Sequence, residues 1–271
     1  MKEYYAESRT GDRDVRLYVR EDGDPGAPPL LLSNSLGTDT SMWEPQLAAF
    51  TERFRVIRYD MRGHGHSESS TGGYDIPLLA RDALAVLDAA DVPSALYCGV
   101  SLGGMVGQWI AINEPRRLER AVLASAGIFI PPQAIAPRLE AIRAQGLPGL
   151  VDEIVPRWFT PRFIDAHPDR VAALKEVFLA NREDGYYGCS AALGTLDHRQ
   201  GIGGVTVPIL VIGGEHDPAV PPEHARELAE KAPGATLVML DAAHLSNMER
   251  PKEFTDAALT FLSGGSPEAG A

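Results

Sequence analysis

Ala95-Leu96-Tyr97-Cys98-Gly99-Val100-Ser101-Leu102-Gly103-Gly104 is the stretch that decides the fold of this 271-residue chain. Its first six residues form a short apolar run of the buried-strand type, and a helical pattern follows the serine. Between the two stands a Gly-x-Ser-x-Gly motif, which is typical of a serine on a sharp, strained strand-to-helix turn with its Oγ exposed above a sheet. The stretch therefore predicts a nucleophilic Ser101, the alternative being a tight structural turn.

The rest of the chain repeats this alternation of strand and helix. Short apolar runs bounded by turn residues occur at residues 15–19, 30–32, 55–59, 121–124, 207–212 and 235–240. Helical spacing occurs between them, at residues 78–87, 226–229 and 254–262. Strands that alternate with helices indicate βαβ units. We therefore predict an α/β fold with a mostly parallel central sheet flanked by helices.

One long segment breaks the alternation. From about Phe129 to Gly201 no convincing strand appears, and the pattern is helical with frequent prolines. We interpret residues 129–200 as a helical cap inserted into a core formed by residues 1–128 and 201–262. The small, polar tail, residues 263–271, is expected to be disordered.

Composition and charge exclude several classes of function. The chain has 25 Lys and Arg against 37 Asp and Glu, a net charge of −12, which argues against nucleic acid or an anionic membrane as the main partner. Two cysteines, Cys98 and Cys189, suit a reducing compartment. The first nine residues lack the apolar core of a signal peptide, and no apolar stretch approaches the ~20 residues that span a bilayer. We expect a cytoplasmic protein without a metal or other cofactor, and a homo-oligomer stays possible.

A nucleophilic serine needs a base and an orienting acid, which in this arrangement follow in the order Ser, Asp or Glu, His. Asp217 comes just after the apolar run at 207–212, and His244 just after the run at 235–240. Both would lie at the carboxyl edge of a parallel sheet, where ligands bind in open α/β sheets. We therefore predict a catalytic triad of Ser101, Asp217 and His244.

Other acids and histidines close to these positions are weaker candidates. Glu215 lies nearer the end of its strand, but the turn favours Asp217. His216 and His224 are expected to be surface or turn histidines. Asp241 is expected to cap a loop.

The tetrahedral intermediate of acyl transfer needs two backbone N–H donors. One should be the amide of Leu102, which follows the nucleophile. The other should be the amide of Leu36, in the loop after the run at 30–32. His64 and His66, in the segment Arg-Gly-His-Gly-His-Ser, are expected to order a Gly-rich loop beside the site.

These motifs together resemble the α/β-hydrolase fold family and, more narrowly, the 3-oxoadipate enol-lactonases of aromatic catabolism. The broad resemblance rests on residues 99–104, residues 62–67 and the late Asp217 and His244. The narrow resemblance rests on less common stretches: Ser-Asn-Ser-Leu-Gly-Thr at 33–38, Gly-Gln-Trp at 107–109, Arg-Trp-Phe-Thr-Pro at 157–161, Gly-Cys-Ser-Ala-Ala-Leu at 188–193 and Ala-Ala-His-Leu-Ser-Asn at 242–247. It covers residues 10 to 262, nearly the whole chain.

The resemblance implies hydrolysis of 3-oxoadipate enol-lactone, a small lactone with one free carboxylate, to 3-oxoadipate through an acyl-enzyme. This reaction belongs to the degradation of protocatechuate and catechol. Two alternatives stay open: a serine esterase or C–C bond hydrolase of the same fold, and a non-catalytic relative that only binds a ligand.

Recognition of the substrate would fall to the cap. Residues 129–200 carry 8 Lys and Arg and 9 Asp and Glu, so the cap is nearly neutral and an anionic substrate is not excluded. Relatives tend to have an Arg where this chain has Gly194, which leaves the carboxylate-binding residue open. The candidates for lining the pocket are Trp158 and Phe159, and the candidates for binding the carboxylate are Arg138, Arg143, Arg157 and Arg162.

Overall fold

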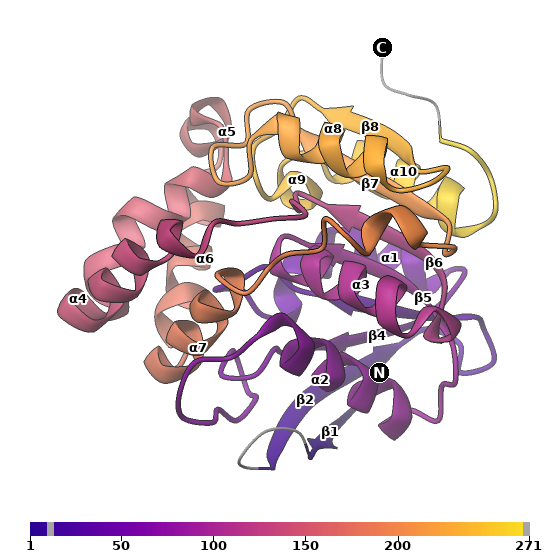
Figure 1. Cartoon of the computed structure of the whole chain (residues 1–271), viewed down its shortest axis with the longest axis horizontal. Helices are drawn as coiled ribbons and strands as arrows, with labels where there is room; N and C mark the ends of the chain where they lie inside the picture. Colours follow the sequence, from indigo (N-terminus) through magenta and orange to yellow (C-terminus); the bar gives the residue numbers. More distant parts are fainter. Residues whose placement is uncertain (10–13, 268–271) are drawn as a thin grey trace.

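The computed structural model describes residues 1–9 and 14–267 and is built around one eight-stranded sheet. The strand order is β1-β2-β4-β3-β5-β6-β7-β8. β2 pairs antiparallel with both β1 and β4, and every other neighbouring pair in this sheet is parallel (Figure 1). The predicted α/β fold with a mostly parallel central sheet is therefore confirmed.

The strands follow the predicted apolar runs closely. They are β1 (Lys2–Ser8), β2 (Val15–Asp22), β3 (Pro29–Ser33), β4 (Arg55–Tyr59), β5 (Ala95–Val100), β6 (Leu118–Ala124), β7 (Ile209–Gly214) and β8 (Thr236–Leu240). β7 begins two residues later than predicted, after Pro208, which has no N–H to donate to a ladder. β1 is not among the predicted strands, because in this edge strand only Ala6 and Ser8 are buried and the apolar alternation is weak.

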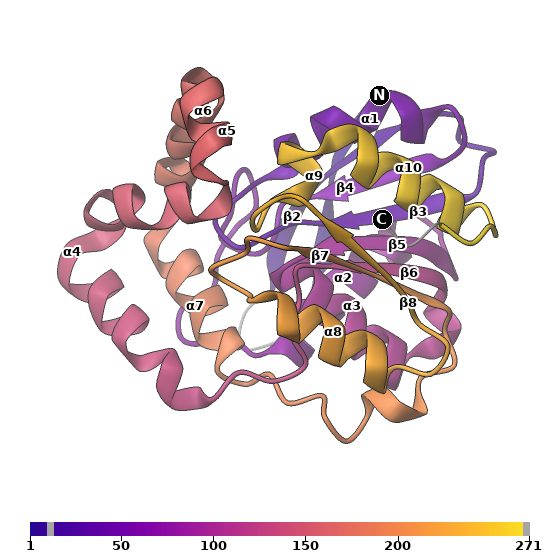
Figure 2. The ribbon, with the colours of Figure 1, turned by 90° about the horizontal axis from the view of Figure 1, so that it is seen from above.

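Helices cover both faces of the sheet. The helices that flank it are α1 (Glu44–Thr51), α2 (Ile76–Ala89), α3 (Leu102–Asn113), α8 (Pro222–Lys231), the short α9 (Ser246–Glu249) and α10 (Pro251–Leu262). In Figure 2, α1 and α10 lie on one face, and α2, α3 and α8 lie on the other. Local sequence sets the helix starts: the side chain of Asp75 accepts the Leu78 N–H of α2 at 2.7 Å, an N-cap interaction.

The segment between β6 and β7 is helical. It holds α4 (Ala136–Ile154), α5 (Pro161–Ala166), α6 (Pro168–Ala180) and α7 (Glu183–Leu193). Figure 2 shows α4, α5 and α6 standing out from the sheet, with α7 nearer to it. The two ends of the segment meet at a bridge between Phe129 and Asp197. We keep the name cap for residues 129–200.

The core lies between the sheet and its helices, and both cysteines, unpaired, are buried in the structure. No helix among the described residues is long and apolar enough to cross a membrane. In the expected disordered tail, the structure describes residues 263–267, where the N–H groups of Gly264 and Gly265 bond to the end of α10. The remaining tail, residues 268–271, lies outside the described residues.

Candidate active site

Ser101 occupies the turn between β5 and α3 in a strained backbone conformation. Its φ is +55° and its ψ −116°, a region that L-residues enter at a cost on the order of 1–3 kcal/mol. The Ser101 N–H donates to Ala124 O at 2.8 Å, and the Ser101 carbonyl accepts the Met105 N–H at 3.0 Å. Because both neighbouring elements hold this peptide, the strain persists and the side chain is kept at the edge of the sheet.

The two glycines of the motif are required by close packing around this turn. A Cβ on Gly99 would lie 2.4 Å from Gly103 O, and a Cβ on Gly103 would lie 2.2 Å from Ser33 O. The Tyr97 hydroxyl adds a hydrogen bond of 2.6 Å to Gly103 O. The strand–turn–helix context that the motif predicts is therefore present.

Asp217 and His244 meet at the carboxyl edge of the sheet, after β7 and β8. Nδ1 of His244 lies 2.8 Å from Oδ2 of Asp217, and both side chains are buried. The other carboxylate oxygen, Oδ1, accepts the N–H groups of Ala219 at 2.8 Å and Val220 at 2.9 Å. An ionised Asp217 in this position places the imidazole proton on Nδ1, which leaves Nε2 of His244 as an acceptor.

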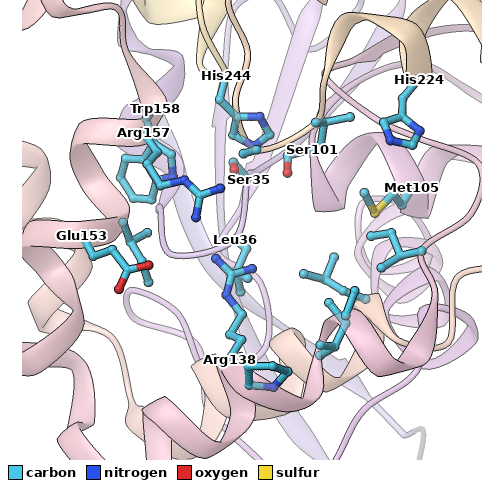
Figure 3. Close-up of a pocket in the computed structure, with 18 of the residues that line it drawn as sticks. Ser35, Leu36, Ser101, Met105, Arg138, Glu153, Arg157, Trp158, His224 and His244 are labelled. Atoms are coloured by element: carbon cyan, nitrogen blue, oxygen red, sulfur yellow. The ribbon is translucent and has the colours of Figure 1, made fainter.

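Ser101 and His244 both line a cavity of about 650 Å³ between the sheet edge and the cap (Figure 3). The core contributes Ser35, Leu36, Met105, Ala219, Val220 and His224 to the remaining wall. The cap contributes mainly apolar side chains, together with the charged Arg138, Glu153 and Arg157. A small molecule in this cavity would be in reach of the serine.

The two predicted oxyanion donors lie next to this cavity. Leu102 is the first residue of α3, so its N–H is in the first turn, where helical N–H groups have no partner within the helix. Leu36 lines the cavity. In the described part of the chain, the N–H groups of Ser35, Gly37 and Thr38 all have acceptors, whereas none is recorded for the N–H of Leu36.

His64 anchors the loop that carries Leu36, a separate loop from the Gly-rich segment 62–67 that it was expected to order. Its Nε2 accepts the Gly37 N–H at 3.0 Å, so Nδ1 carries the proton and bonds to Arg62 O at 3.1 Å. Burial lowers the pKa of His64 to about 4, which keeps the imidazole neutral and able to accept. Asn181, from the cap, donates to Gly37 O at 3.0 Å and so holds the following peptide unit of the same loop. His66 is exposed and lies 3.5 Å from Asp60 instead.

Three of the predicted substrate-binding residues reach the cavity. Trp158, Arg138 and Arg157 line it. Arg162 does not: it is exposed, and its guanidinium pairs with Asp241 at 3.0 Å, because α5 directs it towards the loop after β8. The expectation that Arg162 faces the substrate is therefore wrong.

Arg143 and Phe159 also lie outside the cavity wall. Arg143 lies over the ring of Tyr187, with 4.6 Å to the ring centroid. Phe159 stacks on Phe163, with ring centroids 4.6 Å apart. Both side chains therefore serve packing within the cap.

The competing acids near the proposed triad form surface ion pairs with arginines. Glu215 pairs with Arg226 at 2.9 Å and Asp241 with Arg162 at 3.0 Å, and Asp241 also lies 2.9 Å from Nε2 of His216. His224 was expected at the surface or in a turn, but it lies in the first turn of α8 and lines the cavity. Its position in the sequence, directly after the Asp217 loop, is the feature from which its place at the cavity could have been predicted.

Within residues 1–9 and 14–267, His, Cys, Asp and Glu side chains form no group of three suited to a metal ion.

Comparisons with known proteins identify a family and several similar proteins. Residues 25–257 match the model of the alpha/beta hydrolase family. The chain is 39% identical over 246 residues to 3-oxoadipate enol-lactonase 2 of Acinetobacter baylyi, across 90% of this chain and 92% of that protein. It is 34% identical to 3-oxoadipate enol-lactonase 1 of the same organism, across 97% and 98%. The crystal structure of the enol-lactonase from Burkholderia xenovorans matches with a TM-score of 0.90 and 41% identity, across 92% of this chain and 97% of that one.

Proposed function

The chain belongs to the alpha/beta hydrolase family, and from this premise we propose that it hydrolyses 3-oxoadipate enol-lactone to 3-oxoadipate as a serine hydrolase. The observation that carries the proposal is the strained Ser101 at the wall of a cavity that His244, paired with Asp217, also lines. The two Acinetobacter enol-lactonases support the choice of a lactone, since the similarity extends over almost their full lengths.

In the first half of the proposed reaction, Nε2 of His244 takes the hydroxyl proton of Ser101 while Oγ attacks the lactone carbonyl. Asp217 stabilises the imidazolium that forms and keeps it oriented. Negative charge develops on the carbonyl oxygen and is stabilised by the amides of Leu36 and Leu102. Loss of one such donor typically lowers the rate by ~10²–10³-fold.

Collapse of the intermediate breaks the bond between the acyl carbon and the ring oxygen. The electron pair leaves on that oxygen as an enolate, whose charge is delocalised, and the imidazolium of His244 returns a proton. The opened chain stays attached to Ser101 until His244 activates a water that hydrolyses the acyl-enzyme. A proton shift from oxygen to carbon then converts the released enol into the ketone.

The first test removes the nucleophile. We expect Ser101→Ala to lower kcat on the enol-lactone by about 10⁴-fold or more. The assay monitors the loss of the ultraviolet absorption of the lactone directly. A fluorophosphonate should add its mass to Ser101 in the wild-type protein. A Ser101→Ala variant that keeps most of its activity would exclude this mechanism. Neutral esters turned over faster than the enol-lactone would favour the esterase alternative.

The substrate carboxylate needs a cation in the cavity, and Arg138 is the better placed of the two arginines there. Arg157 is exposed, and its guanidinium donates to Pro218 O at 3.2 Å. Arg138 is half-buried and extends from α4 into the cavity (Figure 3). In the described part of the chain, no carboxylate forms an ion pair with Arg138.

Two buried hydroxyl groups beside Arg138 support this choice. Tyr186 and Ser190 lie one turn apart on α7 and are fully buried, and among the described residues neither hydroxyl forms a hydrogen bond of normal geometry. Burial raises the pKa of Tyr186, and the positive charge of Arg138 opposes that rise, so the guanidinium is close to the phenol. The hydroxyls can accept from one edge of the guanidinium while its other edge binds a carboxylate through two hydrogen bonds. We propose Arg138 as the carboxylate-binding residue.

A matched pair of variants on α4 tests this assignment. Arg138→Met should raise KM for the carboxylated lactone by about 10- to 100-fold, because a charge-assisted hydrogen bond contributes ~1.5–3 kcal/mol, with a much smaller change for its neutral methyl ester. Arg143→Met, whose side chain packs on Tyr187 outside the cavity, should change neither. Equal losses on the acid and the ester would show that Arg138 acts through packing rather than charge.

A further inference from the structure

Glu249 is a buried carboxylate for which the proposed mechanism has no use. It is the last residue of α9, and its exposed fraction is 8%. No Lys or Arg among the described residues forms an ion pair with it. Burial of an unpaired carboxylate is costly unless hydrogen bonds compensate. The groups that donate hydrogen bonds to Glu249 therefore indicate its role.

Those donors come from two separate parts of the chain. Oε2 of Glu249 accepts the N–H of Ala243 at 2.9 Å and the N–H of Thr160 at 3.2 Å. Oε1 accepts the hydroxyl of Thr160 in a short hydrogen bond. Ala243 immediately precedes His244, and Thr160 caps the start of α5 in the cap. One carboxylate therefore joins the loop of the proposed base to the cap.

A backbone hydrogen bond makes the same connection on the other side of His244. The N–H of Leu245 donates to the carbonyl of Trp158 at 2.9 Å, and Trp158 lines the cavity. The residues before and after His244 are thus both attached to the cap segment 158–160. The His244 carbonyl itself accepts from Ser125 Oγ at 2.8 Å.

We propose that Glu249 is a positioning residue, which fixes the His244 backbone against the cap segment 158–160. The base and Trp158, which lines the cavity, then keep the same position relative to each other. The inference rests on the proposed function, because it takes His244 as the base. Reacting groups must be held closely, since a misplacement of about 1 Å can lower a rate by ~10²-fold. The backbone anchors cannot be changed by substitution, whereas Glu249 can.

The experiment compares Glu249→Ala, Glu249→Gln and the control Glu253→Ala, in each case on the full-length protein. Glu253 is exposed and pairs with Arg250 at 2.5 Å, so it shares the residue type but not the contacts. We expect Glu249→Ala to lower kcat about 10- to 100-fold with little change in KM. The rate at which a fluorophosphonate labels Ser101 should fall by a similar factor, because labelling also needs the base.

Glu249→Gln should recover most of both rates, since its amide oxygen can accept the N–H groups of Ala243 and Thr160. Glu253→Ala should match the wild type. A merely structural role would lower the unfolding temperature and leave kcat and the labelling rate of the folded protein unchanged. That result for Glu249→Ala would overturn the proposal.

A milder variant covers the case in which Glu249→Ala does not fold. Thr160→Val removes the hydroxyl that donates to Glu249 and also accepts the Phe163 N–H at the start of α5, and it keeps the backbone donor. It should lower kcat and the labelling rate by the same, smaller factor; unchanged rates would count against the proposal. Failure of the proposed substrate is a separate outcome. A wild-type protein that labels at Ser101 but does not open the enol-lactone would refute that substrate, and the labelling rates would still decide the role of Glu249.

Discussion

Two histidines outside the proposed triad, His64 and His198, are buried and work as neutral hydrogen-bonding groups. His64 accepts the Gly37 N–H beside Leu36, and His198 bonds through Nδ1 to Oε1 of Gln108 at 3.0 Å. Burial lowers the pKa of each to about 4, whereas the unfolded value is about 6.5. Protonation would remove the acceptor that orders the Leu36 loop.

Stability should therefore fall as the pH falls from 6.5 to 4. In this window the unfolded chain binds protons at these histidines and the folded chain does not, so the free energy of unfolding rises with pH, and below about pH 4 both states are protonated. His64→Gln removes one of the two groups and should make the slope shallower, by up to about 1.4 kcal/mol per pH unit. Urea unfolding at several pH values measures this slope of the free energy of unfolding against pH. A His64→Gln slope equal to the wild type would contradict the account.

The placement of the proposed triad residues could be predicted from sequence because they follow strand ends in a fixed order along the chain. The same holds for the placement of Leu36 and Leu102, the proposed oxyanion donors, since each occupies a defined place after a strand. The position of His224 could not, because the side of α8 that faces the cavity depends on how the cap and the loop before the helix pack. The choice among the arginines was likewise beyond the sequence: α5 turns Arg162 towards Asp241.

At the level of elements, the strand–turn–helix around Ser101 combines tight packing with backbone strain. Its conformation, φ +55° and ψ −116°, is the mirror image of a common extended one. Glycine has no Cβ and occupies both mirror images equally well. The strain is therefore a property of the side chain at this position, and a glycine would relieve it.

This leads to a prediction about stability. Ser101→Gly and Ser101→Ala should both be inactive, but Ser101→Gly should be the more stable of the two by about 1 kcal/mol, because relief of the strained φ exceeds the entropy that glycine adds to the unfolded chain. Urea unfolding of the two variants gives the difference directly. A Ser101→Gly protein that is less stable than Ser101→Ala would mean that the turn is not strained.

The elements that sequence reasoning found are those with a wide apolar face. β4 and β5 begin and end where predicted, at residues 55–59 and 95–100. α1 was not predicted, because its buried residues are only Gln46 and Phe50, too few to give a helical apolar pattern. β1 was missed for a similar reason: its register is set by pairing with β2 rather than by its own hydrophobicity.

For the molecule as a whole, the question is whether the cap and the core behave as one unit. α7 lies directly against core loops: a Cβ on Gly63 would lie 2.2 Å from the Cα of Gly185, so the two backbones touch. The Tyr74 N–H donates to Gly188 O at 3.2 Å, and the Ile76 N–H donates to Thr195 Oγ1 at 3.1 Å. These contacts attach α7 and the residues that follow it to the core.

The two cysteines report on the two parts separately. Cys98 lies on β5 in the core and Cys189 on α7 in the cap, and both thiols are free and fully buried. In a urea titration with brief alkylation and mass spectrometry of each peptide, we expect both cysteines to become reactive at the same midpoint, since coincident transitions are the mark of one cooperative unit. The unfolding curve from circular dichroism should share that midpoint. Alkylation of Cys189 at lower urea than Cys98 would show instead that α7 detaches first, and that its contacts with Gly63 and Tyr74 are weaker than their geometry indicates.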